Sequence, residues 1–229
     1  MKEIILNNIR IQLTRKNIKT LRLSVHPPDG EVRLSVPHRI SDQAVKEFID
    51  SREEWIIRQI RKVNSTPRET AKEYISGENH MFLGTEYRLS LQETSGKQGA
   101  EIEDGELVLF VKDGHTKENR EKLLKEWYRE QLKIVIPGFI AKWEPILKVE
   151  VKDWGVKDMK TRWGTCNTRD KRIWINLQLA KKDERYLEYI IVHEMNHLLE
   201  RLHNDKFKEH MTKFLPGWEE LKRGLNYKE

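Results

Sequence analysis

Hydrophobic and polar residues alternate over the first part of the chain. The alternation covers residues 9–13, 21–25 and 32–36, and Pro27-Pro28-Asp29-Gly30 stands between the last two runs. A period of two is typical of half-buried strands, and clustered proline and glycine mark a turn. These residues therefore predict a strand meander at the N-terminus.

Helical spacing begins after Ser41, whose side chain is a favourable N-cap. Apolar residues then recur every three or four positions as far as Val63, and Pro67 lies just beyond them. This pattern predicts one amphipathic helix that ends before the proline. Further strands are predicted around residues 81–91 and 107–111, on either side of a polar stretch.

The pattern changes near residue 113, and helical spacing then runs from Leu124 to Leu147. Pro137 predicts a kink or a division of this helix, because proline lacks a backbone donor and crowds the preceding turn. Short strands at 149–151 and 172–179 and a helix from Asp183 to Arg201 follow. We therefore predict an α+β fold with two domains. Residues 1–112 form a β-rich domain with one helix, and residues 113–229 form a mainly helical domain with a small sheet.

Composition narrows the class of protein. The chain has 229 residues, of which 37% are hydrophobic, so it can bury a substantial core. Cys166 is the only cysteine, which excludes an intrachain disulfide. No apolar run has the length of a signal sequence or of a membrane span. We expect a cytoplasmic protein that does not enter a membrane.

The net charge of +6 is unevenly distributed. Residues 1–112 carry 18 basic and 17 acidic residues, a net charge of +1, and the remainder carries 25 and 20, a net charge of +5. Part of this excess forms a basic stretch before the last predicted helix. A basic rim attracts anionic partners, although a solvated face without any partner is equally compatible with it. The basic stretch comprises Lys157, Lys160, Arg162, Arg169, Lys171, Arg172, Lys181, Lys182 and Arg185.

His193-Glu194-Met195-Asn196-His197 lies inside that last helix. Histidines four apart lie on the same helix face, so both imidazoles can bind one zinc ion while Glu194 reaches a water on the metal. Four of the eight histidines fall between residues 193 and 210, which a helix with two merely solvated histidines would not explain. The pentapeptide predicts a zinc-dependent hydrolase with Glu194 as its catalytic carboxylate.

His203 is the candidate third zinc ligand. In a continuous helix it would lie about 240° around the axis from His197, so the chain must turn between them. Metzincin-type sites make this turn with a glycine, where this chain has Glu200. The turn is therefore expected at residues 202–205, where asparagine and aspartate tolerate helix-ending conformations.

Two alternatives to His203 remain open. His210 lies three turns down the next helical stretch. Glu219 or Glu220 would instead complete a His2Glu site of the kind found in thermolysin-like enzymes.

Several motifs together resemble the YgjP-like metal-dependent hydrolases, which are relatives of the SprT-like and WLM metallopeptidase groups. The resemblance implies a β-rich N-terminal part, a zincin-like or minigluzincin-like C-terminal part, zinc held by His193, His197 and His203, and Glu194 as the catalytic carboxylate. Lys208 departs from the tryptophan that the family commonly has there. The motifs are Leu21-Arg22-Leu23-Ser24-Val25, Pro28-Asp29-Gly30, Phe82-Leu83-Gly84, Lys160-Thr161-Arg162-Trp163-Gly164-Thr165-Cys166, Trp174-Ile175-Asn176 with Leu179, and His193-Glu194-x-x-His197-Leu198 with His203 and Phe207.

Two residues near these motifs, Cys166 and Arg162, are each open to two interpretations, and one nearby segment is a candidate for substrate binding. Cys166 is either a redox-sensitive thiol or auxiliary ligand, or a small packed residue. Arg162 either grips a substrate carboxylate or phosphate, or is structural. Residues 173–177 are the candidate sheet edge for pairing with an extended substrate.

The leading hypothesis from the sequence is a zinc metallopeptidase that acts on a peptide or protein. Zinc polarises phosphoanhydride oxygens as readily as peptide carbonyls, so hydrolysis of a nucleoside triphosphate or another phosphate-bearing substrate is the first alternative. The second alternative is a non-catalytic zinc-binding adaptor whose basic face binds nucleic acid.

Overall fold

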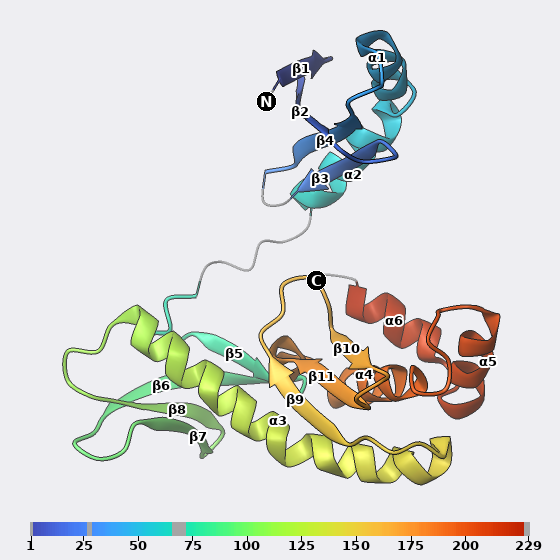
Figure 1. The fold of residues 1–229 in the computed structure, drawn as a ribbon. Coiled ribbons are helices and arrows are strands. Elements are labelled where there is room, and N and C mark those ends of the chain that lie inside the picture. The colour runs from blue at the N-terminus through green and yellow to red at the C-terminus, as the bar shows by residue number, and fades with distance from the viewer. Residues whose placement is uncertain (1, 27–28, 66–71, 227–229) are drawn as a thin grey trace. The chain divides into compact units, whose positions relative to one another are not determined.

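The computed structural model describes residues 2–26, 29–65 and 72–226, and its fold is drawn in Figure 1. The chain divides into two compact units, residues 1–69 (unit 1) and residues 70–227 (unit 2). The turn predicted at Pro27-Pro28 and the helix break predicted at Pro67 lie outside the described residues. Among the described helices, none combines the length and the apolar character needed to cross a bilayer.

Unit 1 consists of a four-stranded sheet and two helices. Its strands β1 (Lys2–Leu6), β2 (Ile9–Lys16), β3 (Arg22–His26) and β4 (Glu31–Pro37) are ordered β1-β2-β4-β3. β2 and β4 are parallel, so the predicted meander of consecutive antiparallel strands is wrong. Two helices, α1 (Asp42–Asp50) and α2 (Glu53–Ser65), replace the single predicted helix, and Ser41 caps α1 as predicted. Buried residues of both helices belong to the same hydrophobic cluster as alternate residues of β2 and β4.

Unit 2 begins with a second sheet of the same topology. Its strands β5 (Asn79–Phe82), β6 (Thr85–Glu93), β7 (Gly99–Glu103) and β8 (Glu106–Val111) are ordered β5-β6-β8-β7, with β6 and β8 parallel. In both sheets the first hairpin closes through two residues with positive φ, Asn7-Asn8 and Leu83-Gly84. Tight two-residue loops select this conformation because it matches the twist of the strands. The chain therefore contains the same four-stranded arrangement twice.

The rest of unit 2 supplies the helices and a third sheet. The elements are α3 (Lys117–Leu147), β9 (Asp153–Lys157), β10 (Gly164–Asn167), β11 (Arg172–Asn176), the 3-10 helix η1 (Leu177–Lys181), α4 (Glu184–Asn196), α5 (Asp205–Phe214) and α6 (Trp218–Asn226). The third sheet has the order β10-β11-β9. The strand predicted at 149–151 is wrong, since β9 starts at Asp153, and the strand predicted at 172–179 ends at Asn176, where η1 begins.

α3 continues through Pro137, so of the two predicted alternatives, a kink or a division, the division is wrong. The proline leaves the carbonyl of Lys133 without its helical donor. Pro137 and Lys133 both lie on the exposed face of α3, where water can satisfy that carbonyl. The buried face of α3 contacts β7, β8, β9, η1 and α4, so packing along its whole length holds it together (Figure 1).

Unit 2 has one continuous hydrophobic core. Leu107 and Leu109 of β8 belong to the same buried cluster as Leu132 of α3, Ile173 of β11 and Ile191 of α4. The boundary predicted after residue 112 therefore falls inside unit 2, because the second sheet shares its core with the helices that follow it. The predicted α+β fold class is confirmed by the six helices and three sheets of the described residues.

The β5–β6 turn fixes the start of α4. The backbone N–H of Leu83 donates to the carbonyl of Ala180 at 2.8 Å. A Cβ added at Gly84, whose φ is +84°, would lie only 2.9 Å from the Cα of Asp183, the N-cap residue of α4. The turn thus depends on a glycine for its conformation and for close contact with the helix.

We expect Gly84→Ala to destabilise unit 2 by about 3 kcal/mol, because it adds a steric clash to the strain of a left-handed residue. Gly105→Ala is the matched control: its φ is +82°, also in a two-residue hairpin loop, but no atom lies within 4 Å of the added Cβ. It should cost about 1 kcal/mol. Urea unfolding followed by tryptophan fluorescence measures both, since six of the seven tryptophans lie in unit 2. Equal losses would show that the contact with Asp183 contributes nothing.

Candidate metal centre

α4 carries the first part of the site. Its N-cap Asp183 accepts a hydrogen bond from the backbone N–H of Arg185, and its middle is buried between the third sheet and the other helices. His193 lies within the helix and His197 is its C-cap, so the two rings project from one face, as their spacing predicted.

The chain turns immediately after α4 and brings His203 back toward His193. Leu198, Leu199 and Glu200 donate backbone hydrogen bonds to Met195 and Asn196, which closes a tight turn. All of residues 197–204 are described, and none has a positive φ. The turn therefore needs no glycine, which explains why Glu200 can stand at the metzincin glycine position. It begins before the predicted segment 202–205, where Asn204 instead caps α5.

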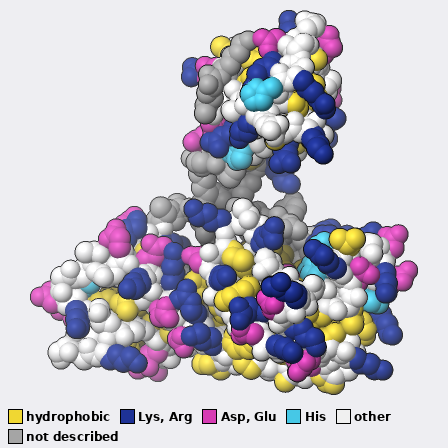
Figure 2. Space-filling view, viewed as in Figure 1, with side chains coloured by type: hydrophobic (Ala, Val, Ile, Leu, Met, Phe, Trp, Pro, Cys, Tyr) yellow, Lys and Arg dark blue, Asp and Glu magenta, His cyan; other side chains and the backbone are white. Residues whose placement is uncertain are grey.

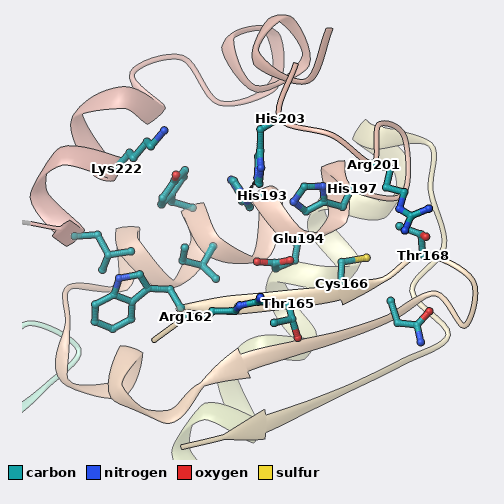
Figure 3. Close-up of a pocket in the computed structure, with 16 residues that line it drawn as sticks. Arg162, Thr165, Cys166, Thr168, His193, Glu194, His197, Arg201, His203 and Lys222 are labelled. Atoms are coloured by element: carbon teal, nitrogen blue, oxygen red, sulfur yellow. Dashed lines mark hydrogen bonds between the residues drawn. The ribbon is translucent and has the colours of Figure 1, made fainter. Parts of the chain in front are cut away.

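His193, His197 and His203 form a cluster, called here the histidine cluster (Figure 3). One ligand atom from each residue lies within 4.8 Å of the others. The Nε2 atoms of His193 and His203 are 2.9 Å apart, a separation that requires a proton or a cation between them. All three rings pack around the buried ring of Phe207, at centroid distances of 4.8 to 4.9 Å. Phe207 is thus a packing surface that the three imidazole rings share.

The predicted alternatives to His203 do not join the cluster. The Nδ1 of His210 faces the side-chain oxygen of Asn196 at 3.2 Å, and Asn196 also donates to the carbonyl of Phe207. Glu220 lies near Arg223 of its own helix. Among the described residues, only the histidine cluster brings three metal-ligating groups together.

The electrostatics of the cluster favour neutral imidazoles. Burial, helped by His197 and His203, lowers the pKa of His193 to about 3. Burial also lowers the pKa of His197 and of His203. The Nδ1 of His193 is buried and has no hydrogen-bond partner among the described residues. Neutral imidazole is the form that binds a metal, so the donor set fits a divalent ion such as zinc.

Glu194 lies beside the histidine cluster and faces β10. It is only 5% exposed, and burial raises the pKa of Glu194 to about 8, an effect that Arg162 opposes. A cation bound by the histidines would act in the same direction as Arg162 and favour the carboxylate. A Cβ added at Gly164 would lie 2.6 Å from the Oε1 of Glu194. Only glycine at the start of β10 allows the carboxyl group this position.

Cys166 lies two residues along β10 from Gly164 and faces α4 as well. Burial raises the pKa of the Cys166 thiol to about 12, and Glu194 adds to the effect. The group is therefore a neutral thiol, and it does not belong to the histidine cluster. This supports the interpretation of Cys166 as a small packed residue.

β10 is the edge of the third sheet beside the site. β11 lies between β10 and β9, so residues 173–177 do not form the predicted free edge. The prediction failed because β11 is apolar on the side that packs on the core, a pattern that edge and central strands share. All four residues of β10 line a cleft of about 820 Å³ that also contains the histidine cluster and Glu194.

Few cations of the basic stretch reach this cleft. Arg162 lines it, whereas other members form ion pairs elsewhere. The pairs are Arg169 with Asp170, Lys171 with Glu150, Arg172 with Asp153, and Arg185 with Asp183. Figure 2 likewise shows basic and acidic side chains interspersed on the visible face of unit 2. Two further cations line the cleft, Arg201 and Lys222. Neither was a candidate site residue in the sequence.

One comparison with known proteins identifies the family of the chain. A search of curated proteins found no match. The model of the YgjP-like metallopeptidase domain matches residues 19–228, which include the histidine cluster and Glu194. That match covers most of the chain and confirms the resemblance stated from the motifs. The chain therefore belongs to the YgjP-like family of metallopeptidase domains.

Proposed function

We propose that this protein is a zinc-dependent peptidase in which the histidine cluster holds the metal and Glu194 is the general base. One observation carries the proposal: three imidazoles converge within 4.8 Å beside a buried carboxylate that lines an open cleft. The family indicates a metal-dependent peptidase, and the donor set favours zinc among metals, since three histidines with one open position are a common catalytic zinc site.

When bound, zinc would supply Lewis-acid chemistry, which polarises a carbonyl group and lowers the pKa of water. The residues of the chain carry out the proton transfers. Glu194 accepts a proton from the attacking water and delivers it to the nitrogen of the leaving amine, so it acts first as a general base and then as a general acid. β10 offers its unpaired backbone groups to an extended substrate, which would place the scissile bond beside Glu194.

The test starts from protein purified without added metal. We expect about one zinc per chain by elemental analysis, cleavage of an unstructured polypeptide, loss of cleavage on dialysis against a chelator, and recovery with zinc. The same preparation is assayed against nucleoside triphosphates and for salt-dependent nucleic-acid binding. Phosphate release with every polypeptide left intact would favour the phosphohydrolase alternative. Nucleic-acid binding without any turnover would favour the adaptor.

Gly164→Ala tests the contact that holds Glu194. We expect kcat to fall at least tenfold with zinc content unchanged, because a methyl group 2.6 Å from Oε1 must displace the carboxylate while the histidines stay in place. Gly99→Ala, also at the first position of a strand but with no atom within 4 Å of its added Cβ, is the control and should keep full activity. Full activity in Gly164→Ala would show that the contact does not position Glu194.

A further inference from the structure

The side chains that line the cleft carry a net positive charge. Among the described residues that line it, Arg162, Arg201 and Lys222 are positive and Glu194 is the one acidic residue, so its side chains sum to +2 when Glu194 is ionised. A zinc ion in the histidine cluster would raise this to +4.

The three cations come from different parts of the fold. Arg162 precedes β10, Arg201 follows the turn after α4, and Lys222 lies on α6, with its Nζ 5.5 Å from the centre of the Trp218 ring. Figure 3 shows Lys222 on one side of the histidine cluster and Arg201 on the other, with Arg162 beside Glu194. All three residues are exposed and line the cleft.

An extended peptide that crosses the histidine cluster would therefore meet positive charge before and after the scissile bond. A phosphate group would need several donors that converge on one point, whereas Lys222 and Arg201 lie on opposite sides of the histidine cluster. The arrangement matches separate carboxylates spaced along a peptide better than one compact polyphosphate.

We infer that the cleft selects peptide segments with acidic residues on both sides of the scissile bond, and that Arg162, Arg201 and Lys222 determine this specificity. The inference rests on the proposed peptidase function and names its substrate class. Long-range attraction in a cleft of one sign raises the association rate and the affinity for ligands of the opposite sign, and salt weakens both effects. Basic residues at the same substrate positions would be rejected by the same field.

The binding test uses the zinc-loaded Glu194→Gln protein, in which peptide is bound without being cut. Fluorescence anisotropy compares one unstructured peptide carrying glutamates on both sides of a central site with its glutamine and lysine versions. We expect the order glutamate, glutamine, lysine, with roughly three- to tenfold between steps and a smaller spread at high salt. Equal affinities would overturn the inference. Tighter binding of a polyphosphate or oligonucleotide than of the glutamate peptide would overturn it in favour of a phosphate ligand.

The activity test uses the wild type and two charge reversals, Lys222→Glu and Arg201→Glu. Each should lower kcat/KM for the glutamate peptide by roughly three- to tenfold and raise it for the lysine peptide. Lys122→Glu on α3 makes the same change of net charge outside the cleft and should leave the preference intact. Cleavage of all three peptides at equal rates by the wild type would overturn the inference and leave the peptidase proposal standing. Cleavage of no polypeptide at all would instead contradict the peptidase proposal.

Discussion

Glu194→Gln should retain about one zinc per chain while its kcat for peptide cleavage falls by at least about 10³-fold, the range that removal of a general base produces. Glutamine has nearly the same volume as glutamate, so it preserves the contact with Gly164. It lacks the basic carboxylate, however, and cannot take a proton from water. The histidine cluster does not depend on Glu194 for any hydrogen bond in the described structure. Elemental analysis and steady-state kinetics on one preparation measure both quantities.

A matched substitution separates this effect from a general loss of negative charge. Glu209→Gln makes the same chemical change on the exposed face of α5, outside the cleft, and should leave kcat and zinc content at wild-type values. Normal turnover in Glu194→Gln would eliminate Glu194 as the general base. Loss of zinc in Glu194→Gln would instead give the carboxylate a role in holding the metal, and the assignment of the base would have to be made again.

Local geometry explains why the centre of the site could be predicted from the sequence. The positions of His193, Glu194 and His197 follow from helical periodicity alone, and helical spacing around them identified the helix. For His203, one could predict only that the chain must turn after His197 if this residue is to reach the metal, and the predicted position of the turn was too late. The turn begins at His197 because Asn196 ties the end of α4 to Phe207, a contact between elements that no local pattern contains.

The rest of the cleft depends on long-range packing. Arg201 and Lys222 lie in segments without a motif, and α6 brings Lys222 to the cleft only through its packing against α4. The cations of the basic stretch lie close together in sequence, yet Arg162 is the member that lines the cleft. Four others form ion pairs, two with Glu150 and Asp153 before the stretch and two with Asp170 and Asp183 inside it. Charge that is clustered along a chain is therefore a poor guide to charge that is clustered in a cleft.

The strands illustrate the same limit. Alternation located most strands of the two four-stranded sheets, because period two is a local property. Neither the parallel pairing of β2 with β4 and of β6 with β8 nor the central place of β11 has a local signal. The domain boundary failed for a related reason. Composition changes where strands give way to α3, but α3 packs on the preceding sheet and completes its core.

His203→Ala should weaken zinc binding by at least about 100-fold, because it removes one of three donors and leaves an incomplete site. Competition with a chromophoric chelator measures the affinity. The wild type should also show a rise in melting temperature with zinc, since a ligand that binds only the folded state stabilises it, and that rise should shrink or vanish in the variant. His203 is exposed, and among the described residues its ring packs against His193, His197 and Phe207, so the metal-free variant should fold normally.

His210→Ala is the control, because it also removes an imidazole from the segment after α4. Its ring faces Asn196 rather than the cluster, so zinc affinity should stay within about threefold of the wild type. Glu219→Gln and Glu220→Gln complete the set and should likewise keep zinc. The outcome that would contradict the assignment is specific: zinc retained in His203→Ala but lost in one of the two glutamine variants. That result would place the third ligand on α6 and would require α6 to approach the two histidines of α4 more closely than it does in this fold.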